Sequence, residues 1–200
     1  ELAKVIGLLH DIGRFEQIRK FNILSDNRTG FDHADESCVY LFNEGHIRDF
    51  IEDYQYDSIL EKSIRNHNKF EIEMDLTEEE LLFSKMIRDM DKIDIYRVLA
   101  VNFEQVFRAS EVSEEVLREF QKEKTICNRL VKSDSDKTLV RLAFIFDMNF
   151  NESFDILVEQ DNFDLFLSVV EVSEDSEKLW KKVREICFDR INYGIGEKDE

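Results

Sequence analysis

The stretch Leu8-Leu9-His10-Asp11-Ile12-Gly13-Arg14 lies close to the start of the chain and decides how the rest of it is interpreted. Upstream of His10, apolar residues recur at helical spacing from Leu2 to Leu9, which predicts a helix packed into a core. The His10–Asp11 pair then places an imidazole beside a carboxylate at the buried end of that helix. Buried polar groups need polar partners or a metal, so this pair is the first candidate for a functional site.

The composition predicts a helical globular protein. Hydrophobic residues make up 42% of the 200-residue chain and include 17 Phe, which is enough for one sizeable core. Proline, the strongest helix breaker, is absent, and only six Gly interrupt the chain. We therefore expect an all-α fold built from long helices, with no linker that marks a second domain.

The charge balance excludes two classes of partner. With 27 Lys and Arg against 45 Asp and Glu, the formal net charge is −18, which repels nucleic acid polymers and anionic membranes. No segment has the roughly 20 apolar residues that span a bilayer, and no signal peptide is recognisable. Cys38, Cys127 and Cys187 are scattered and lack CxxC spacing, so we expect buried free thiols in a cytoplasmic protein.

The order of polar and apolar segments predicts where the helices lie. Residues 19–31 lose the apolar periodicity and contain a cluster of small polar residues and Gly, so we expect a loop there. Asp32 is a candidate N-cap, and Thr77–Glu80 has the pattern of a capping box. Gly194 and Gly196 are expected to end the last helix. The expected helices cover residues 32–42, 57–70, 78 to beyond 97, 113–123, 139–150 and 173–193, with a poorly punctuated apolar segment at 151–172 and a frayed tail at 197–200.

Three further segments extend the first motif: Phe31-Asp32-His33-Ala34-Asp35, Asn66-His67-Asn68-Lys69 and Arg88-Asp89-Met90-Asp91-Lys92-Ile93-Asp94. In this order and spacing they resemble the HD superfamily of metal-dependent phosphohydrolases. HDIGRFEQ, DHA, HNK and RDMDKID look like one bacterial branch of that family. The resemblance runs from Glu1 to about Arg97 and implies an HD-domain helical bundle. It implies a single HD-type domain over residues 1–200, with a metal-site core at 1–100 and a C-terminal helical extension at 101–200.

The resemblance also implies a set of metal ligands. Imidazole suits divalent transition metals, and carboxylates suit Mn²⁺, Mg²⁺ and Fe, so a mixed set on separate helices resembles metal sites in helical bundles. In the family the HD aspartate bridges two metals when extra His ligands are present, which favours two metals here, with Mn, Fe, Mg, Ni, Co and Zn not distinguished. The family places its first His ligand on a preceding helix, so we expect that residue upstream of Glu1. The expected metal ligands in this chain are His10, Asp11, His33, His67 and Asp91.

Two basic residues are candidates for holding a substrate phosphate. Arg14 follows Asp11 by three residues, on the same face of a continued helix. A guanidinium pairs with phosphate through two hydrogen bonds, and related enzymes carry Lys or Arg at this position. Lys69 is the second candidate. We assign Asp11 and Arg14 as catalytic residues, with an ion pair to an acidic neighbour as the alternative role of Arg14.

Charged residues around Asp91 have expected supporting roles. Asp89 and Asp94 are expected to support the ligands or to cap a helix, because each flanks the predicted ligand without matching its place in the motif. Arg88 and Lys92 are expected to neutralise this acidic cluster, with substrate contact as the alternative.

The leading functional hypothesis is a metal-dependent phosphohydrolase acting on a small phosphomonoester or phosphodiester, a nucleotide by analogy with the family. Two alternatives stay open. Di-iron oxygenases share the ligand pattern, so the ligands alone do not separate hydrolysis from oxygen activation. A non-catalytic HD module that senses a nucleotide or binds a partner is the other. The Phe-rich stretch at 144–154 is expected to be core, with a substrate surface or a homodimer surface as the alternative.

Overall fold

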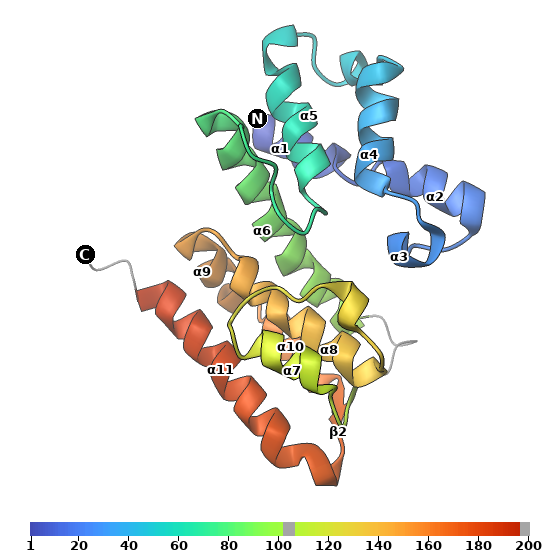
Figure 1. Cartoon of the computed structure of the whole chain (residues 1–200). Coiled ribbons are helices and arrows are strands. Elements are labelled where there is room, and N and C mark those ends of the chain that lie inside the picture. The colour runs from blue at the N-terminus through green and yellow to red at the C-terminus, as the bar shows by residue number, and fades with distance from the viewer. Residues whose placement is uncertain (102–106, 197–200) are drawn as a thin grey trace. The chain divides into compact units, whose positions relative to one another are not determined.

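A computed structural model describes residues 1–101 and 107–196 of the chain (Figure 1). Helices form nearly all of its regular structure, and the strands found in these residues, β1 (Phe107–Ala109) and β2 (Val170–Val172), have three residues each. The predicted all-α class is therefore confirmed. The residues form two compact units, Glu1–Arg88 and Asp89–Glu200. The expected single domain, divided near residue 100, stays a prediction.

The first unit is built around α1 and α5. Ile6 and Leu9 of α1 are buried with Leu60 and Ile64 of α5, so the apolar spacing that predicted the first helix also explains its packing. The core also includes Cys38, Leu41, Ile47 and Ile87. The elements of this unit are α1 (Leu2–Leu9), α2 (Gly13–Phe21), α3 (Asp26–Thr29), α4 (His33–Cys38), a π-helix (Val39–Asn43), 3-10 turns (His46–Asp49 and Tyr54–Tyr56), α5 (Asp57–Asn66) and the start of α6 (Glu78–Val101).

Helix starts in this unit follow the predicted caps. The Asp32 carboxylate accepts hydrogen bonds from the backbone N–H groups of Ala34 and Asp35 and begins α4. At α6 the Thr77 N–H donates to Glu80 Oε2 at 2.8 Å, and the Glu80 N–H donates to Thr77 Oγ1 at 3.3 Å. This is the reciprocal pair of the expected capping box.

Two predicted boundaries in this unit are wrong. The expected loop at 19–31 begins too early, because α2 runs to Phe21, and the short helix α3 lies inside it. The expected helix at 57–70 ends at Asn66. Its final turn is replaced by a contact from α6, since the Arg88 guanidinium donates to the backbone carbonyls of Asn66 and Lys69.

The second unit packs helices around large apolar side chains. Its core contains the fully buried Tyr96, Phe120, Phe154, Phe166 and Trp180. The strands β1 and β2 pair in parallel, with Phe107 opposite Val170 and Ala109 opposite Val172. The elements after α6 are β1, α7 (Glu114–Phe120), a 3-10 turn (Asn128–Leu130), α8 (Asp134–Leu142), a 3-10 helix (Ala143–Asp147), α9 (Asn151–Glu159), α10 (Asn162–Ser168), β2, a 3-10 turn (Glu174–Ser176) and α11 (Glu177–Gly196).

Sequence patterns misplaced three boundaries in the second unit. The helix expected at 139–150 begins earlier, because Ser133 and Asp136 form a capping box, and it gives way to a 3-10 helix at Ala143. The apolar segment 151–172 contains α9, α10 and β2. Gly194 does not stop α11 but lies inside it, where an added Cβ would stand 2.3 Å from the Phe154 ring. The expected tail at 197–200 lies outside the described residues.

Asp89 caps a helix, which is one of the two roles expected for it. Its buried carboxylate accepts hydrogen bonds from the backbone N–H groups of Asn149 and Phe150 and from the Ser153 hydroxyl, at the start of α9. Lys92 pairs with Asp147 at 2.7 Å. The capping role of Asp89 was expected, whereas its partners at the start of α9 and the pairing of Lys92 with Asp147 were not.

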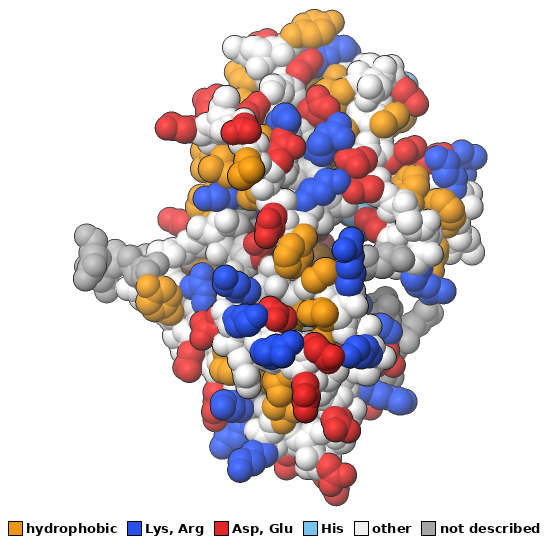
Figure 2. Space-filling model, in the orientation of Figure 1, with side chains coloured by type: hydrophobic (Ala, Val, Ile, Leu, Met, Phe, Trp, Pro, Cys, Tyr) orange, Lys and Arg blue, Asp and Glu red, His pale blue; other side chains and the backbone are white. Residues whose placement is uncertain are grey.

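The cysteines are free, as expected, and two of the three are fully buried. Cys38 and Cys187 are inaccessible, whereas Cys127 is half-buried. Burial raises the pKa of the Cys38 thiol to about 12. Among the described residues no helix has both the length and the apolar character needed to cross a membrane. Acidic and basic side chains are interspersed over the face that Figure 2 shows.

Candidate metal centre

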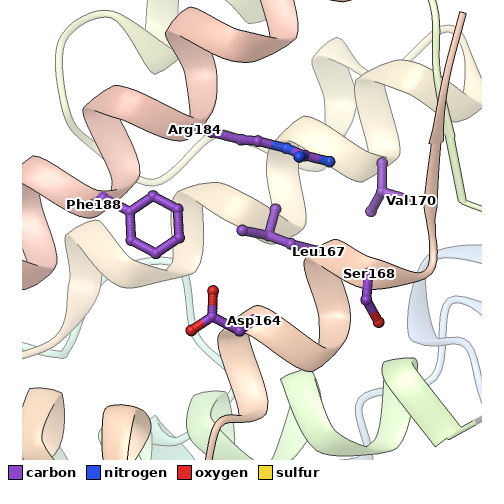
Figure 3. A pocket seen from close by; sticks show the side chains of 6 residues that line it. All are labelled: Asp164, Leu167, Ser168, Val170, Arg184 and Phe188. Atoms are coloured by element: carbon purple, nitrogen blue, oxygen red, sulfur yellow. The ribbon is translucent and has the colours of Figure 1, made fainter.

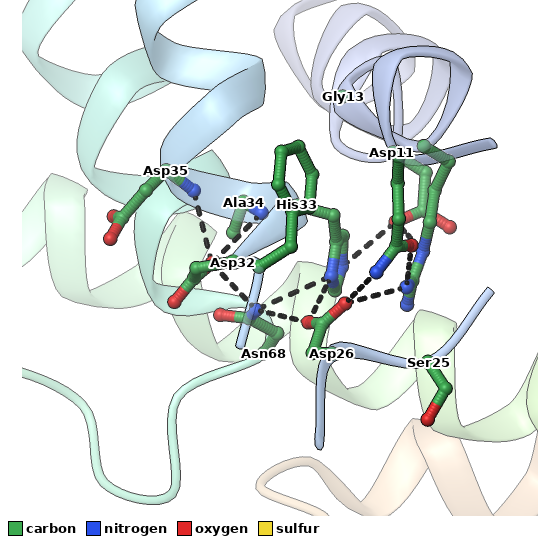
Figure 4. A network of polar contacts seen from close by, with 12 residues as sticks. Asp11, Gly13, Ser25, Asp26, Asp32, His33, Ala34, Asp35 and Asn68 are labelled. Carbon is green, nitrogen blue, oxygen red and sulfur yellow. Dashed lines mark hydrogen bonds and ion pairs between the residues drawn. The ribbon is translucent and has the colours of Figure 1, made fainter. Parts of the chain in front are cut away.

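Four of the predicted ligands come together in the first unit, and each stands at a helix end. His10 and Asp11 follow α1 directly, His33 is the first residue of α4, and His67 is the C-cap of α5. Asp26, the first residue of α3, lies beside His33, and Figure 4 shows this network of polar contacts. Helix ends carry backbone groups without partners inside the helix, and polar side chains gather there. The ends of α1, α3, α4 and α5 can therefore form one polar cluster inside an apolar unit.

The centre of the cluster is a triangle of ligand-type atoms. The His33 and His67 Nε2 atoms are 2.9 Å apart. Asp11 Oδ1 lies 3.1 Å from His33 Nε2 and 3.5 Å from His67 Nε2. Both histidines are buried, with exposed fractions of 3% and 4%, so water has little access to these nitrogens.

The Nδ1 atom of each of these two histidines, which faces away from the triangle, already has a hydrogen-bond partner. His67 Nδ1 lies 2.6 Å from the Ile64 carbonyl oxygen, which can only accept, so Nδ1 carries the proton. His33 Nδ1 lies 2.5 Å from Asp26 Oδ2, and this carboxylate favours a proton on Nδ1 in the same way. In the neutral tautomers both Nε2 atoms therefore present lone pairs to each other.

Asp11 contributes the third electron-rich atom. Its Oδ1 is buried and has no partner in hydrogen-bond geometry, although the two imidazoles are close. Burial acts to raise the pKa of Asp11, but the adjacent His33 and His67 outweigh it and hold that pKa far below its ordinary value. The carboxylate is thus ionised. When both imidazoles are neutral and carry their protons on Nδ1, three lone-pair donors meet at one point. A divalent cation satisfies such a set, and the arrangement fits one.

A proton is the other group that could satisfy the triangle. Burial acts to lower the pKa of His33, but Asp11 and Asp26 outweigh it, so the pKa is raised. A charged His33 would donate from Nε2 to a neighbour. Cation and proton therefore compete for the same lone pairs, which is the usual relation between metal binding and acidity.

His10 stands beside His67. Its ring meets the His67 ring edge to face, with centroids 4.9 Å apart, and its Nε2 lies 3.9 Å from Asp11 Oδ2. Nδ1 is 2.9 Å from the Gly7 carbonyl oxygen, so the ring is oriented from its outer side like the other two. His10, Asp11 and His67 offer ligand atoms within 4.8 Å of one another, and so do Asp26, Asp32 and His33.

Both predicted phosphate-binding residues lie beside the cluster in ion pairs. Arg14 donates to Asp26 Oδ1 at 2.9 Å, and its Nε lies 3.5 Å from Asp11 Oδ1. Lys69 donates to Asp32 Oδ2 at 2.6 Å and lies 3.3 Å from Asp35 Oδ1. The ion pair that was the alternative role of Arg14 is thus present, and a phosphate role for either residue stays a prediction.

Asp91 lies on α6 in the second unit, so its expected place among the ligands stays a prediction. His46 matched no motif, and its ring stacks on Tyr40 with centroids 4.2 Å apart.

Sequence reasoning missed Asp26, which is the hub of the outer network. Its carboxylate contacts His33 and accepts hydrogen bonds from Arg14, Gln17 and Asn68. Asp26 stands in a polar segment that was interpreted as a loop, so no periodicity marked it. The only available signal was an acidic residue close before the His33 motif.

Comparison with family models, with curated proteins and with solved structures finds no match for this chain.

Proposed function

We propose that this protein is a metal-dependent phosphohydrolase that acts on a small phosphorylated substrate. The observation that carries the proposal is the convergence of His33 Nε2, His67 Nε2 and the ionised Asp11 Oδ1, which accepts no hydrogen bond. The resemblance of four motifs to HD phosphohydrolases supports the same chemistry. A nucleotide is the substrate class that the resemblance suggests.

In this proposal one group of residues binds the metal. His10, Asp11, His33 and His67 would hold the cation, with Asp91 as the proposed fifth ligand. A divalent cation bound there supplies a Lewis acid that activates water and polarises a phosphoryl oxygen. Two ions in preference to one is what the resemblance to the family suggests. The Asp11 side chain is 45% exposed, so the cluster has an open side for a substrate.

Arg14 and Lys69 would position the phosphate. Both side chains are partly exposed at the edge of the cluster, and both are already ordered by carboxylates. A phosphate that displaces Asp26 from Arg14, or Asp32 from Lys69, exchanges one charge-assisted hydrogen bond for another. Their presence favours a phosphorylated substrate over the oxygenase alternative, in which no anionic phosphate has to be held.

The test compares metal content and activity in three forms of the full chain. Unaltered protein, Asp11→Ala and His46→Ala are purified, analysed for bound metals and screened against phosphate esters with added Mn²⁺. We expect Asp11→Ala to lose metal and hydrolysis while its helical circular dichroism is retained, because the core is built by apolar residues. His46→Ala, a histidine outside the cluster, should keep both.

Three results would overturn the proposal. Unchanged metal content in Asp11→Ala would remove the carboxylate from the site. Tightly bound iron without hydrolysis of any ester would favour the oxygenase alternative, and a folded protein that binds no metal would favour the non-catalytic module.

A further inference from the structure

A pocket in the second unit lies between one face of α10 and one face of α11. It has a volume of about 440 Å³, inside the range of roughly 300–1,000 Å³ that is typical of small-molecule sites. Its lining follows helical spacing, because positions three and four apart lie on one face. The lining residues are Asp164, Leu167 and Ser168 of α10, Val170 of β2, and Arg184 and Phe188 of α11.

The walls of this pocket combine an apolar surface with two opposite charges. Phe188 is half-buried and offers an accessible apolar surface, and the nearly buried Leu167 and Val170 form the floor beside it. In Figure 3 the Arg184 side chain reaches from α11 over Leu167, and the Asp164 carboxylate points up from α10 toward the same space. The Ser168 hydroxyl is already engaged, since it donates to the Leu165 carbonyl at 2.7 Å.

The two charges do not neutralise each other. Within residues 1–101 and 107–196, neither Arg184 nor Asp164 forms an ion pair, although both line one pocket. In a chain with 45 acidic and 27 basic residues, an arginine that leaves a nearby carboxylate unpaired keeps its hydrogen-bond donors available. A guanidinium binds a carboxylate through two parallel hydrogen bonds, and Asp164 is suited to an ammonium group.

We propose that this pocket binds a compact zwitterion with an apolar body, the chemistry of a free apolar amino acid. Arg184 takes the carboxylate, Asp164 takes the ammonium group, and the side chain of the ligand packs against Leu167, Val170 and Phe188. Each end of the ligand then meets its opposite charge, and the apolar wall selects against small polar amino acids. The pocket is formed by residues of the second unit alone, and the proposal does not depend on the proposed hydrolysis.

The experiment uses three matched ligands on the full chain: phenylalanine, 2-phenylethylamine without the carboxylate, and 3-phenylpropionate without the ammonium group. Binding is followed by amide chemical shifts of α10 and α11. We expect phenylalanine to bind at least about tenfold more tightly than either analogue, because each loses one charged hydrogen-bonding group.

Variants then assign the two ends of the ligand. Arg184→Gln should weaken phenylalanine and 3-phenylpropionate and leave 2-phenylethylamine unchanged, whereas Asp164→Asn should weaken phenylalanine and 2-phenylethylamine only. Arg184→Lys keeps the charge without the paired donors and should give an intermediate affinity. Lys182→Gln, on an exposed part of α11, is the matched charge control.

Three outcomes would overturn the proposal. The first is no saturable shift in α10 and α11 with phenylalanine. The second is 3-phenylpropionate binding as tightly as phenylalanine, which would make the pocket a site for simple anions. The third is equal loss of affinity in Lys182→Gln and Arg184→Gln, which would reflect net charge and not the pocket.

Discussion

Asp26 fixes which nitrogen of His33 can bind a metal. Its Oδ2 lies 2.5 Å from His33 Nδ1 and holds the proton there, so that Nε2 faces Asp11 and His67 with its lone pair. A carboxylate behind a ligating imidazole is a common support in metal sites, because it sets the tautomer and the ring orientation. Asp26 is therefore a positioning residue in the proposed centre and not a ligand.

We predict that Asp26→Asn lowers metal affinity by about 10–100-fold. The asparagine can turn its NH₂ group toward Nδ1, and this favours the tautomer with the proton on Nε2. Metal affinity is measured by calorimetry, and the His33 tautomer is measured by ¹⁵N chemical shifts of the protein without added metal. Asp53→Asn, a change at an exposed acidic cap, is the control and should alter neither. An unchanged tautomer together with a lost affinity would contradict the mechanism.

The residues that carry chemistry were predictable where a motif marked them. His10, Asp11, His33 and His67 share family-like spacing and do lie together. The partners that orient them were not predictable, because Asp26 and the Ile64 carbonyl are joined to the histidines by folding and not by a repeated pattern. The ion pairs that hold Arg14 and Lys69 have the same origin.

At the scale of elements, α2 and α4 approach each other through Gly13. The Gly13 N–H donates to Ser37 Oγ at 2.9 Å, and an added Cβ would lie 2.3 Å from the His33 carbonyl oxygen. Because that oxygen belongs to the backbone of α4, it cannot move aside as a flexible side chain could. The close packing of α2 on α4, the helix that begins with His33, therefore requires glycine at position 13.

We predict that Gly13→Ala lowers the free energy of unfolding of the first unit by about 1–3 kcal/mol, the usual range for overpacking. Gly7→Ala is the matched control. Gly7 lies on α1 with nothing within 4 Å of an added Cβ, so alanine there should raise stability by up to about 1 kcal/mol. Denaturant titration of both variants makes the comparison. Equal effects of the two changes would mean that α2 and α4 can separate without cost.

Helix boundaries could be predicted where a local sequence pattern sets them and could not be predicted where a tertiary contact does. The start of α4 at Asp32 and the start of α6 at Thr77 were predictable, because a side-chain cap is a local feature. The end of α5 was not, since Arg88 reaches it from α6. The strands β1 and β2 were also missed, because each is three residues long and pairs with a segment about sixty residues away.

At the scale of the whole molecule, metal binding should stabilise one unit selectively. His10, Asp11, His33 and His67 all belong to Glu1–Arg88, and a ligand that binds only the folded state stabilises it by about 2.7 kcal/mol at a hundred times its dissociation constant. We predict that added Mn²⁺ slows hydrogen exchange in α1, α4 and α5 and leaves α7, α8 and α11 unchanged. Peptide-resolved hydrogen exchange measures this.

The same experiment tests Asp91. Slower exchange in the peptide that contains Asp91 would support it as the fifth ligand, and no change there would leave the metal to the first unit alone. The Asp11→Ala variant is the control, because its exchange should not respond to Mn²⁺. Uniform slowing over α7, α8 and α11 would contradict a site confined to the proposed ligands.

The three cysteines differ in burial, so the rates at which their thiols are labelled can report the unfolding of each unit separately. Cys38 is sealed in the first unit and Cys187 in the second, and burial raises the pKa of both thiols, so neither is a nucleophile while its surroundings are intact. Cys127 is half-buried and should be labelled at once by a disulfide reagent. The two slower phases would then report, within one sample, how often each half of the chain comes apart.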